Sequence, residues 1–311
     1  MEEQPTAQPA VLCLGEPMLE FNQQPDGRYL SGYGGDTSNC AIAAARQGAH
    51  TGYLTRIGRD PFGDQFMALW TREGIDTRGV VVTDDGHTGV YFVTHHETGH
   101  AFSYLRAGSA ASRMRPADLR RDLIRQARVL HISGISMAIS DSAADTVLAA
   151  IDTANGAGVP VSFDANFRPR LWSLPRARAM IHAAMAQSHF ALPGIDDAQA
   201  LTGLTDPDRI VDFYLRLGPA VVALTLGAQG VLVATAGRRE RIASHSVDSV
   251  DATGAGDTFD GAFLAECLRV NDPFEAAHYA NAAAALATTG YGAVAPIPSR
   301  EQVTRFIDNR R

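Results

Sequence analysis

The chain has 311 residues, 45% of them hydrophobic and 20% charged, and a formal net charge of −7 at pH 7. It is long enough to bury a large core with a minor appendage or a second domain, and its composition is that of an ordinary soluble globular enzyme. The negative charge argues against a nucleic-acid partner, which would need a basic face. Six arginines lie between positions 113 and 128, but the interleaved Asp118 and Asp122 favour a solvated helix face there.

The first ten residues are polar and acidic and contain no apolar segment. No apolar run anywhere in the sequence is long enough to span a bilayer. We therefore expect a disordered tail over residues 1–10, no membrane partner and a cytoplasmic location.

The positions of the cysteines and histidines do not predict a metal site. The three cysteines are far apart in apolar contexts, and we expect them to be small reduced core residues: Cys13, Cys40 and Cys267. Three histidines lie close together without a carboxylate or cysteine that would complete a tetrahedral site, and we expect a solvated turn at His95, His96 and His100.

Short apolar runs alternate with helical patterns along the chain. Strands are expected at 11–14, 53–57, 80–82, 129–132, 159–163, 190–192 and 221–226. Helices are expected at 37–47, 63–73, 141–155, 176–187, 207–217 and 276–289. This alternation predicts an α/β fold with a doubly wound, mainly parallel, Rossmann-like sheet. Ligands of such sheets bind beyond the carboxyl ends of the strands.

Two segments interrupt the alternation. Residues 16–33 and 88–105 each place a turn between short extended pieces, at Pro25-Asp26-Gly27 and at Glu97-Thr98-Gly99, which is typical of β-hairpins. We expect the four strands to form a small antiparallel sheet that acts as a lid and excludes water. A structural or dimerising sheet is the alternative. The core would then comprise residues 11–15, 34–87 and 106–311.

The stretch DATGAGDTFDGAFL, residues 251–264, is a small-residue loop that leads into a helix. Gly254 and Gly256 allow a tight turn, and the helix N-terminus offers unpaired N–H groups and a positive dipole end. Asp257 would repel a bound phosphate, so it is useful only where the loop also takes a proton from an attacking hydroxyl. For such a base position matters more than strength, so an ordinary pKa would suffice. The alternative is a glycine-rich turn whose acidic residues favour the dipole.

A second glycine-rich stretch runs from Gly34 to Asn39 and opens a helix. Gly34 and Gly35 allow a substrate to approach the backbone, and Asp36 and Asn39 can bond several hydroxyls. An N-capped helix start is the alternative, and it explains Asp36 but not both glycines.

Charged and aromatic side chains are expected beside these loops. Arg168 follows a central strand, where it can clamp a carboxylate or phosphate. Tyr104 and Arg106 end the second hairpin and point to one face by alternation. Each alone fits a surface residue equally well, but together the two arginines favour a substrate with an anionic end.

A nucleotide site is expected near the end of the strand at 221–226. Thr225 and Gly227, followed by Gly230, form a strand end and a tight loop that could back a nucleotide. Asn281 lies on a helix face of small residues that would admit a base, although packing of that helix on the sheet explains the alanines equally well. The chain contains neither a P-loop motif nor the protein-kinase motifs.

The stretches GGDTSNCAIAAARQG and DATGAGDTFDGAFL, in this order and separation, resemble the two signatures of the ribokinase-like (phosphofructokinase B type) carbohydrate kinase family. Within that family, GEPMLEFN, YFVTHHETGHAFSYLRAGSAAS and DANFRPRLW are similar to 2-keto-3-deoxygluconate kinases. The likeness covers almost the whole chain after the tail. It implies ATP and Mg²⁺, a lidded Rossmann-like core and frequent oligomerisation through the lid.

The resemblance also implies roles for single residues. Asp257 would be the catalytic base, in a loop formed with Gly254, Ala255 and Gly256, of which Ala255 and Gly256 belong to the anion hole. Combined with the candidates above, the substrate residues are Gly34, Gly35, Asp36, Asn39, Tyr91, Tyr104, Arg106 and Arg168. Those for ATP are Thr225, Gly227, Gly230 and Asn281.

The chain departs from the family pattern at two places. The N-x-x-E motif that helps to organise magnesium falls on residues 194–197, where Gly194 and Asp197 replace Asn and Glu. Asp197 is therefore an indirect candidate for the metal. Ala252 stands where many members have Thr or another small polar residue, which leaves a bound monovalent cation open.

The expected activity is ATP-dependent phosphorylation of the terminal hydroxyl of 2-keto-3-deoxy-D-gluconate to the 6-phosphate. A kinase of the same family for fructose, ribose or a nucleoside is one alternative, and a non-catalytic sugar-binding protein or a structural oligomer is another. Arg106 and Arg168 favour the acid, because arginines left unpaired by a neutral sugar in a closed site are costly. Asp257 argues against a pure binder. The sequence does not distinguish the gluconate-derived acid from the galactonate-derived acid as substrate.

Overall fold

The computed structural model describes residues 8–24, 26–96 and 99–310. The expectations for residues 1–7, for the turns at Pro25 and at Glu97 and Thr98, and for the side chains of His95, His96 and His100 lie outside the described part of the chain. Ordered structure begins earlier than expected, because Pro9 is buried and the Ala10 N–H donates a 2.7 Å hydrogen bond to the His50 carbonyl. Residues 9 and 10 therefore belong to the edge of the core.

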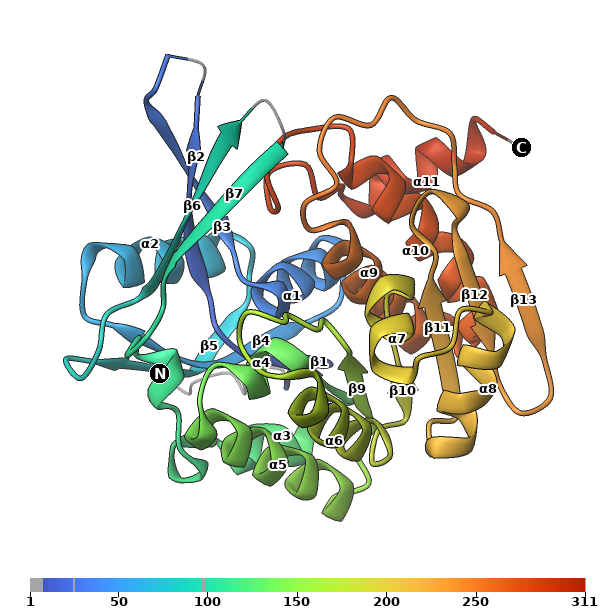
Figure 1. Ribbon diagram of the computed structural model, residues 1–311, viewed down its shortest axis with the longest axis horizontal. Coiled ribbons are helices and arrows are strands. Elements are labelled where there is room, and N and C mark those ends of the chain that lie inside the picture. Colours follow the sequence, from blue (N-terminus) through green and yellow to red (C-terminus); the bar gives the residue numbers. More distant parts are fainter. Residues whose placement is uncertain (1–7, 25, 97–98, 311) are drawn as a thin grey trace, which may run out of the picture.

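A nine-stranded sheet crosses the described part of the molecule (Figure 1). In spatial order its strands are β13 (Arg239–Ile242), β12 (Val231–Ala234), β11 (Val221–Thr225), β10 (Phe190–Ala191), β9 (Val161–Asp164), β8 (Val129–Ser133), β1 (Val11–Leu14), β4 (Thr51–Gly58) and β5 (Asp76–Thr83). Neighbours from β11 to β5 pair in parallel. This confirms the predicted doubly wound, mainly parallel α/β fold.

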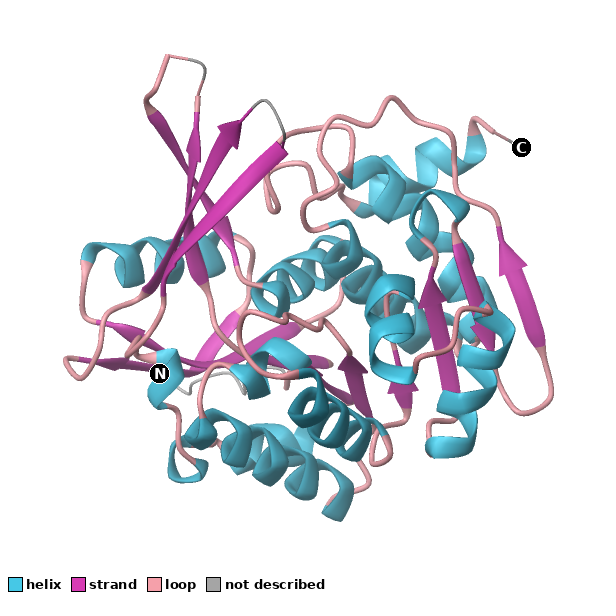
Figure 2. Ribbon diagram, viewed as in Figure 1, coloured by secondary structure: helices cyan, strands magenta, loops and turns pink. Residues whose placement is uncertain are grey.

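Helices cover both faces of this sheet (Figure 2). Successive strand side chains point to opposite faces, so Val11 and Cys13 pack on one side and Leu12 and Leu14 on the other. The first side is covered by α1 (Asp36–Arg46), α2 (Pro61–Arg72), α9 (Ala255–Val270), α10 (Pro273–Ala287) and α11 (Arg300–Asp308). The second is covered by α3 (Arg121–Gln126), α4 (Gly134–Ala138), α5 (Asp141–Gly156), α6 (Leu174–Met185), α7 (Ile195–Thr202) and α8 (Pro207–Leu217).

The strand order reverses at β1. The chain leaves β1 toward β4 and β5 and later returns to β8 on the other side of β1. A reversal of this kind opens a crevice at the carboxyl ends of the strands, where ligands of open α/β sheets bind. The segments that follow β1, β8 and β9 therefore border the expected site.

A second, four-stranded sheet in the order β3-β2-β6-β7 projects from the core beside α2 (Figure 1). Its strands are β2 (Met18–Gln23), β3 (Tyr29–Gly34), β6 (Gly89–His96) and β7 (Gly99–Leu105). Each hairpin is antiparallel, as predicted, but β2 and β6 pair in parallel, with Met18 opposite Gly89. Both strands leave the core at the same place and run outward together, which makes this pairing parallel.

Several short elements were not predicted. Strands β12 and β13 add an antiparallel edge beside β11, and α4, α7 and α11 are new, as are the 3-10 turns η1 (Ala111–Arg113), η2 (Pro116–Asp118) and η3 (Gly227–Gln229). Helices of about two turns carry too little periodicity to be recognised, and β12 and β13 were missed although the equally short β1 was predicted. The arginine-rich helix face is only partly present, since α3 begins at Arg121.

Cys13 and Cys40 are buried, Cys267 is partly buried, and all three are free thiols, as expected. Each helix in the described part of the chain is too short or too polar to cross a lipid bilayer.

Candidate active site

The candidate catalytic carboxylate, Asp257, lies in the first turn of α9 and contacts α1. The Asn39 side-chain amide donates a 2.7 Å hydrogen bond to Oδ2 of Asp257. The two helices approach closely because Gly261 faces α1, where an added Cβ would lie 2.3 Å from the Cys40 carbonyl oxygen. The glycine-rich loops at residues 34–39 and 251–257 therefore contact each other, as they must if both belong to one site.

The turn that precedes α9 depends on glycine. Gly254 has φ of 75°, and an added Cβ would lie 2.9 Å from the Ala293 carbonyl oxygen. Ala255 and Gly256 follow as the first helical residues, and nothing lies within 4 Å of a Cβ added at Gly256. N–H groups in a first helical turn have no intrahelical acceptor and carry the positive end of the dipole. The Ala255 N–H donates a 3.2 Å hydrogen bond to the Ala252 carbonyl, so the loop offers an anion the donors around Gly256, where the space is open.

Burial raises the pKa of Asp257 to about 7, and the negative charge of Asp36 acts in the same direction. The Asn39 hydrogen bond and the positive charge of Arg168 oppose the shift. The expectation of an ordinary pKa is therefore wrong, because burial and three neighbours from other elements decide the value, and the sequence does not show them. A carboxylate with a pKa near neutrality is suited to accept a proton from a hydroxyl.

Asp36 is held from two sides. Its Oδ1 accepts a 2.8 Å hydrogen bond from the Thr37 N–H, and its Oδ2 accepts one of 2.8 Å from the Asn166 side chain. Gly35, not Asp36, occupies the N-cap position, with φ of 98° and the Glu16 carbonyl 2.4 Å from an added Cβ. Asn166 was missed, although it lies in the segment after a central strand, where a polar side chain reaches the ligand edge.

Further carboxylates gather behind Asp257. Burial and the charge of Asp197 raise the pKa of Asp164, and burial with the charge of Asp164 raises that of Asp260. Asp197 has a raised pKa through burial, and its Oδ2 accepts a 3.0 Å hydrogen bond from the Phe167 N–H. Among the described residues, no group of three or more Asp, Glu, His and Cys side chains is arranged to hold a metal ion.

The small sheet brings four predicted substrate residues together. Tyr91 and Tyr104 are paired across β6 and β7, and their ring centroids are 6.0 Å apart. The Arg106 guanidinium lies 5.6 Å from the Tyr104 ring centroid. Gly34 is required beneath Tyr91, because an added Cβ would lie 2.6 Å from the Tyr91 hydroxyl. That hydroxyl donates to Glu20, a buried residue that the sequence reasoning did not single out.

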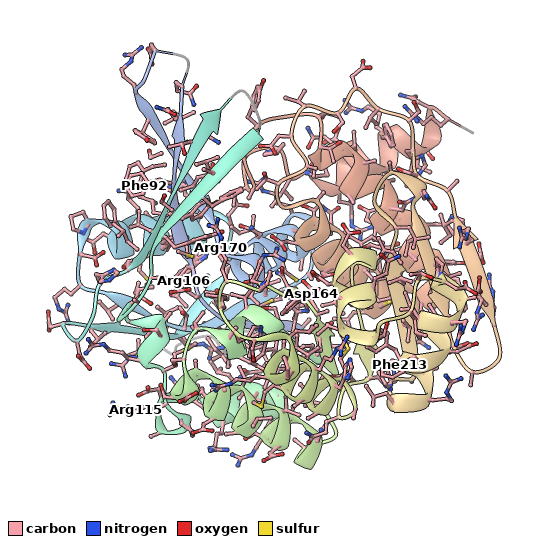
Figure 3. All side chains as sticks on the ribbon, in the orientation of Figure 1. Phe92, Arg106, Arg115, Asp164, Arg170 and Phe213 are labelled. Atoms are coloured by element: carbon pink, nitrogen blue, oxygen red, sulfur yellow. The ribbon has the colours of Figure 1, made fainter. Side chains whose placement is uncertain are left out.

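Neither arginine is unpaired, which corrects the argument for an acidic substrate. Arg106 donates to the buried carboxylate of Glu16 through Nε, at 2.9 Å, and through Nη2. Arg168 is 48% exposed, donates a 3.0 Å hydrogen bond to the Phe167 carbonyl, and lies 3.9 Å from Asp197. Glu16 was missed, although it lies two residues after β1, the strand at which the sheet reverses. Figure 3 shows Arg106 where the small sheet joins the core.

The predicted nucleotide residues lie around β11 and β12. Thr225 ends β11 and pairs with Gly194 in an isolated bridge, and Gly227, with φ of 57°, has open space around it. Gly230 is required by packing, because an added Cβ would lie 2.0 Å from the Ile242 carbonyl oxygen. Asn281 donates a 2.7 Å hydrogen bond to the Ala243 carbonyl. Gly230 and Asn281 thus have structural roles, and their contact with ATP stays a prediction.

The protein combines a doubly wound sheet, a smaller second sheet and a site at which two glycine-rich loops meet. These features are those of a ribokinase-like sugar kinase. The chain belongs to the pfkB family carbohydrate kinases, whose family model matches residues 9–300. This confirms the family that the sequence resembles.

Individual proteins of this family are similar over nearly the full length. The chain is 33% identical to 2-dehydro-3-deoxygluconokinase of Thermoproteus tenax, over 96% of this chain and 94% of that protein. It is 31% identical to fructokinase-1 of Oryza sativa subsp. japonica, over 96% and 98%. A solved E. coli structure, described as a ribokinase II in complex with ATP and Mg²⁺, is 26% identical, with a TM-score of 0.89 over 97% of this chain and 99% of that chain.

Proposed function

We propose that this sugar kinase transfers the γ-phosphoryl group of ATP to the terminal hydroxyl of 2-keto-3-deoxy-D-gluconate and forms the 6-phosphate. The observation that carries the phosphoryl transfer is Asp257, which lies in the first turn of α9 with a pKa of about 7 and a hydrogen bond from Asn39. The choice of substrate is supported by the similarity to the Thermoproteus tenax enzyme and by the half-exposed Arg168 beside the site.

In the proposed mechanism, Asp257 accepts the proton of the terminal hydroxyl as its oxygen attacks the γ-phosphorus. A bond forms between these two atoms while the bond from the γ-phosphorus to the β–γ bridging oxygen breaks, and ADP leaves with that oxygen. The N–H groups at Gly254 and Gly256 stabilise the charge on the transferred group. The Ala255 N–H would join them by exchanging its 3.2 Å hydrogen bond to the Ala252 carbonyl for one to the phosphoryl group. Asn39 keeps the Asp257 carboxylate oriented toward the hydroxyl.

The sugar acid would lie between the two glycine-rich loops and the small sheet. Gly34 and Gly35 allow it to approach the backbone, while Asp36 and Asn39 bond its hydroxyls. Tyr91 and Tyr104 form one wall of the site. Arg168 is the carboxylate ligand in this proposal, because it is half-exposed and its ion pair with Asp197 is long at 3.9 Å, so it can turn toward a stronger partner.

ATP would bind along Thr225, Gly227, Gly230 and Asn281, with its γ-phosphate at the N-terminus of α9. Mg²⁺ fits the edge formed by Asp164 and Asp197, because the charge of Asp197 raises the pKa of Asp164 and a divalent cation would relieve that repulsion. Mg²⁺ in such sites takes one or two carboxylates together with substrate phosphates and neutralises the phosphate charge.

A neutral sugar such as fructose is the second candidate. The specific observation in its favour is the Glu16–Arg106 pair, which has no net charge and so attracts an acid less than an unpaired arginine would. The similarity to the rice fructokinase points the same way.

An ATP-consumption screen of the purified enzyme decides between the two candidates. The substrates are the keto-deoxy acids derived from gluconate and galactonate, fructose, ribose and nucleosides. The proposal expects the highest kcat/KM for a keto-deoxy acid. A higher kcat/KM for fructose would overturn it.

We also propose that two copies of the chain associate through the small sheet. Leu30, Asn22, Val93 and Phe102 are paired in one row across the four strands, so their side chains share one face. Leu30 is 63% exposed at one end of the row and Phe102 is exposed at the other. Burying such a face against a second copy would remove apolar surface from water.

A further inference from the structure

One buried carboxylate, Glu16, lies at the junction of the two sheets. In the described chain, the backbone passes between the sheets after β1, after β3, after β5 and after β7. Glu16 itself belongs to the first connection, and its carbonyl oxygen would be 2.4 Å from a Cβ on Gly35 in the second. Its Oε1 would be 3.1 Å from a Cβ on Gly89, which ends the third. The fourth connection supplies Arg106 and Ser109.

The contacts of Glu16 to the fourth connection are polar and buried. Its Oε2 accepts from Nε and Nη2 of Arg106, and its Oε1 accepts a 2.7 Å hydrogen bond from the Ser109 hydroxyl. The Glu16 side chain has no exposed surface and that of Arg106 is 12% exposed. A buried carboxylate without its cation is strongly destabilised, so the pair stays formed and the plane of the guanidinium is set by Glu16.

This arrangement leaves one edge of the Arg106 guanidinium available to a ligand. Both hydrogen bonds that the described residues accept from Arg106 use the Nε–Nη2 edge, and they leave Nη1 for another acceptor. The guanidinium also lies over Tyr104, which is paired with Tyr91. A shift of the Glu16 carboxylate would therefore move the cation and the tyrosine wall relative to the loop at residues 34–39.

We propose that Glu16 is a positioning residue for sugar binding, which acts by holding Arg106 in place. The proposal rests on the proposed function, in which Tyr104 forms one wall of the sugar site, and it takes the adjacent Arg106 as a further contact of the sugar. A purely neutralising role for Glu16 predicts the opposite result on mutation, because removing a negative charge strengthens the attraction of the site for an acid. A positioning role predicts weaker binding despite that added attraction.

The first test compares Glu16→Gln and Glu16→Asp with the parent enzyme. Gln removes the charge and keeps the shape, whereas Asp keeps the charge and withdraws the carboxylate by one methylene. In both variants we expect the KM for the sugar to rise by about tenfold or more, since small misplacements of a binding group are costly. The KM for ATP should stay within about twofold of the parent, because no nucleotide residue contacts Glu16.

Glu73→Gln is the matched control. Arg46, in the last turn of α1, donates to the two carboxylate oxygens of Glu73 through Nε at 3.0 Å and through Nη2 at 2.7 Å, so the same guanidinium edge is paired with a glutamate there. This variant should lower Tm without changing either KM. A sugar KM that is unchanged or lower in Glu16→Gln would overturn the proposal.

A double-mutant cycle with Arg106→Ala tests whether Glu16 acts through Arg106. In the Arg106→Ala background, Glu16→Gln should leave the sugar KM unchanged and should recover part of the lost Tm, because it removes a buried unpaired charge. A further rise in the sugar KM would contradict the proposal. The KM is measured for whichever sugar the parent prefers, so a preference for fructose refutes the proposed substrate and still allows Glu16 to be judged.

Discussion

Asn39 and Asp257, 218 positions apart in the sequence, are joined by a hydrogen bond of 2.7 Å from the amide of Asn39 to Oδ2 of Asp257. The bond connects the two glycine-rich loops and orients the carboxylate that we propose as the base. Because Asn39 is buried and Asp257 lies at a helix start, the bond also links the base to the rigid core.

Asp257→Asn should lower kcat by about a hundredfold to ten-thousandfold, the usual contribution of a general base. The amide keeps the shape of the side chain but cannot accept the proton of the hydroxyl. The Kd for ATP, measured by calorimetry, should stay close to that of the parent. Near-normal turnover of the variant would end the assignment of Asp257 as base.

The pH dependence of kcat/KM should show an acidic limb near pH 7. The carboxylate must be ionised to act as a base, and its pKa is raised to about 7, so activity is present above that pH and falls about tenfold per unit below it.

Two substitutions should move this limb in opposite directions. Asp36→Asn removes a negative charge that raises the pKa of Asp257 and should shift the limb to lower pH, whereas Asn39→Ala removes a hydrogen bond that lowers the pKa and should shift it to higher pH. Initial rates between pH 5 and 9, spanning about two units on each side of that pKa, measure both shifts. Shifts of the same sign would show that another group controls the limb.

Gly261→Ala should destabilise the protein by about 1–3 kcal/mol, the usual cost of an overpacked contact. The new Cβ would meet the Cys40 carbonyl at 2.3 Å and the Ala43 Cβ at 2.6 Å, so α9 must move away from α1. Because these helices carry Asp257 and Asn39, kcat should fall as well.

Gly156→Ala is the control for this substitution. Gly156 ends α5, and an added Cβ there meets nothing within 4 Å, so this variant should be neutral or stabilised by up to about 1 kcal/mol. Urea unfolding of both variants gives the comparison. Equal effects of the two changes would contradict the close approach of α1 and α9.

Arg168→Ala should raise the KM for a keto-deoxy acid by about tenfold to a hundredfold, which is the range for a lost hydrogen bond to a charged group. Activity on fructose should change little. Arg170→Ala removes a nearby positive charge whose Nη1 bonds the Phe102 carbonyl at 3.0 Å, and it should leave the KM for the acid close to that of the parent. If both variants respond alike, the charge of the region and not a direct contact explains the effect.

Leu30→Asp should convert the expected dimer to a monomer, because it places a charge on the apolar face of the small sheet. Leu105→Asp is the control, since Leu105 is 60% exposed but is paired with Val90 and points to the opposite face. Light scattering after size-exclusion chromatography measures the mass of each variant. A monomeric parent enzyme, or dissociation by Leu105→Asp alone, would exclude this interface.

Local patterns predicted most of the fold. The run at residues 11–14 and the helix at 207–217 match β1 and α8 residue for residue, because apolar periodicity and a turn or proline at each end act over short distances. The same reasoning missed β12 and β13 and gave an antiparallel contact where β2 and β6 are parallel. The direction of pairing between two hairpins depends on where both hairpins leave the core. No local sequence pattern contains that information.

The sequence predicted several residues of the site but not the contacts between them. Glycines near Asp257 and Asp36 indicated two loops that bind a ligand. Their partners came from distant segments, as Glu16 does for Arg106 and Asn166 for Asp36, at separations of 90 and 130 residues. The argument from unpaired arginines failed for this reason, since an ion pair is visible only when both side chains have been placed.

The sequence by itself determined most of the order of strands and helices, the two hairpins and the family, because periodicity, turn residues and motif spacing are local properties of the chain. Only the tertiary structure decided that Asp257 has a pKa near 7, that Arg106 is bound to Glu16, and that Gly261 brings α1 against α9. Each of these depends on burial or on the approach of side chains from separate elements. Burial and these contacts arise only when the sheet and its helices pack together. No single segment of the chain therefore predicts them.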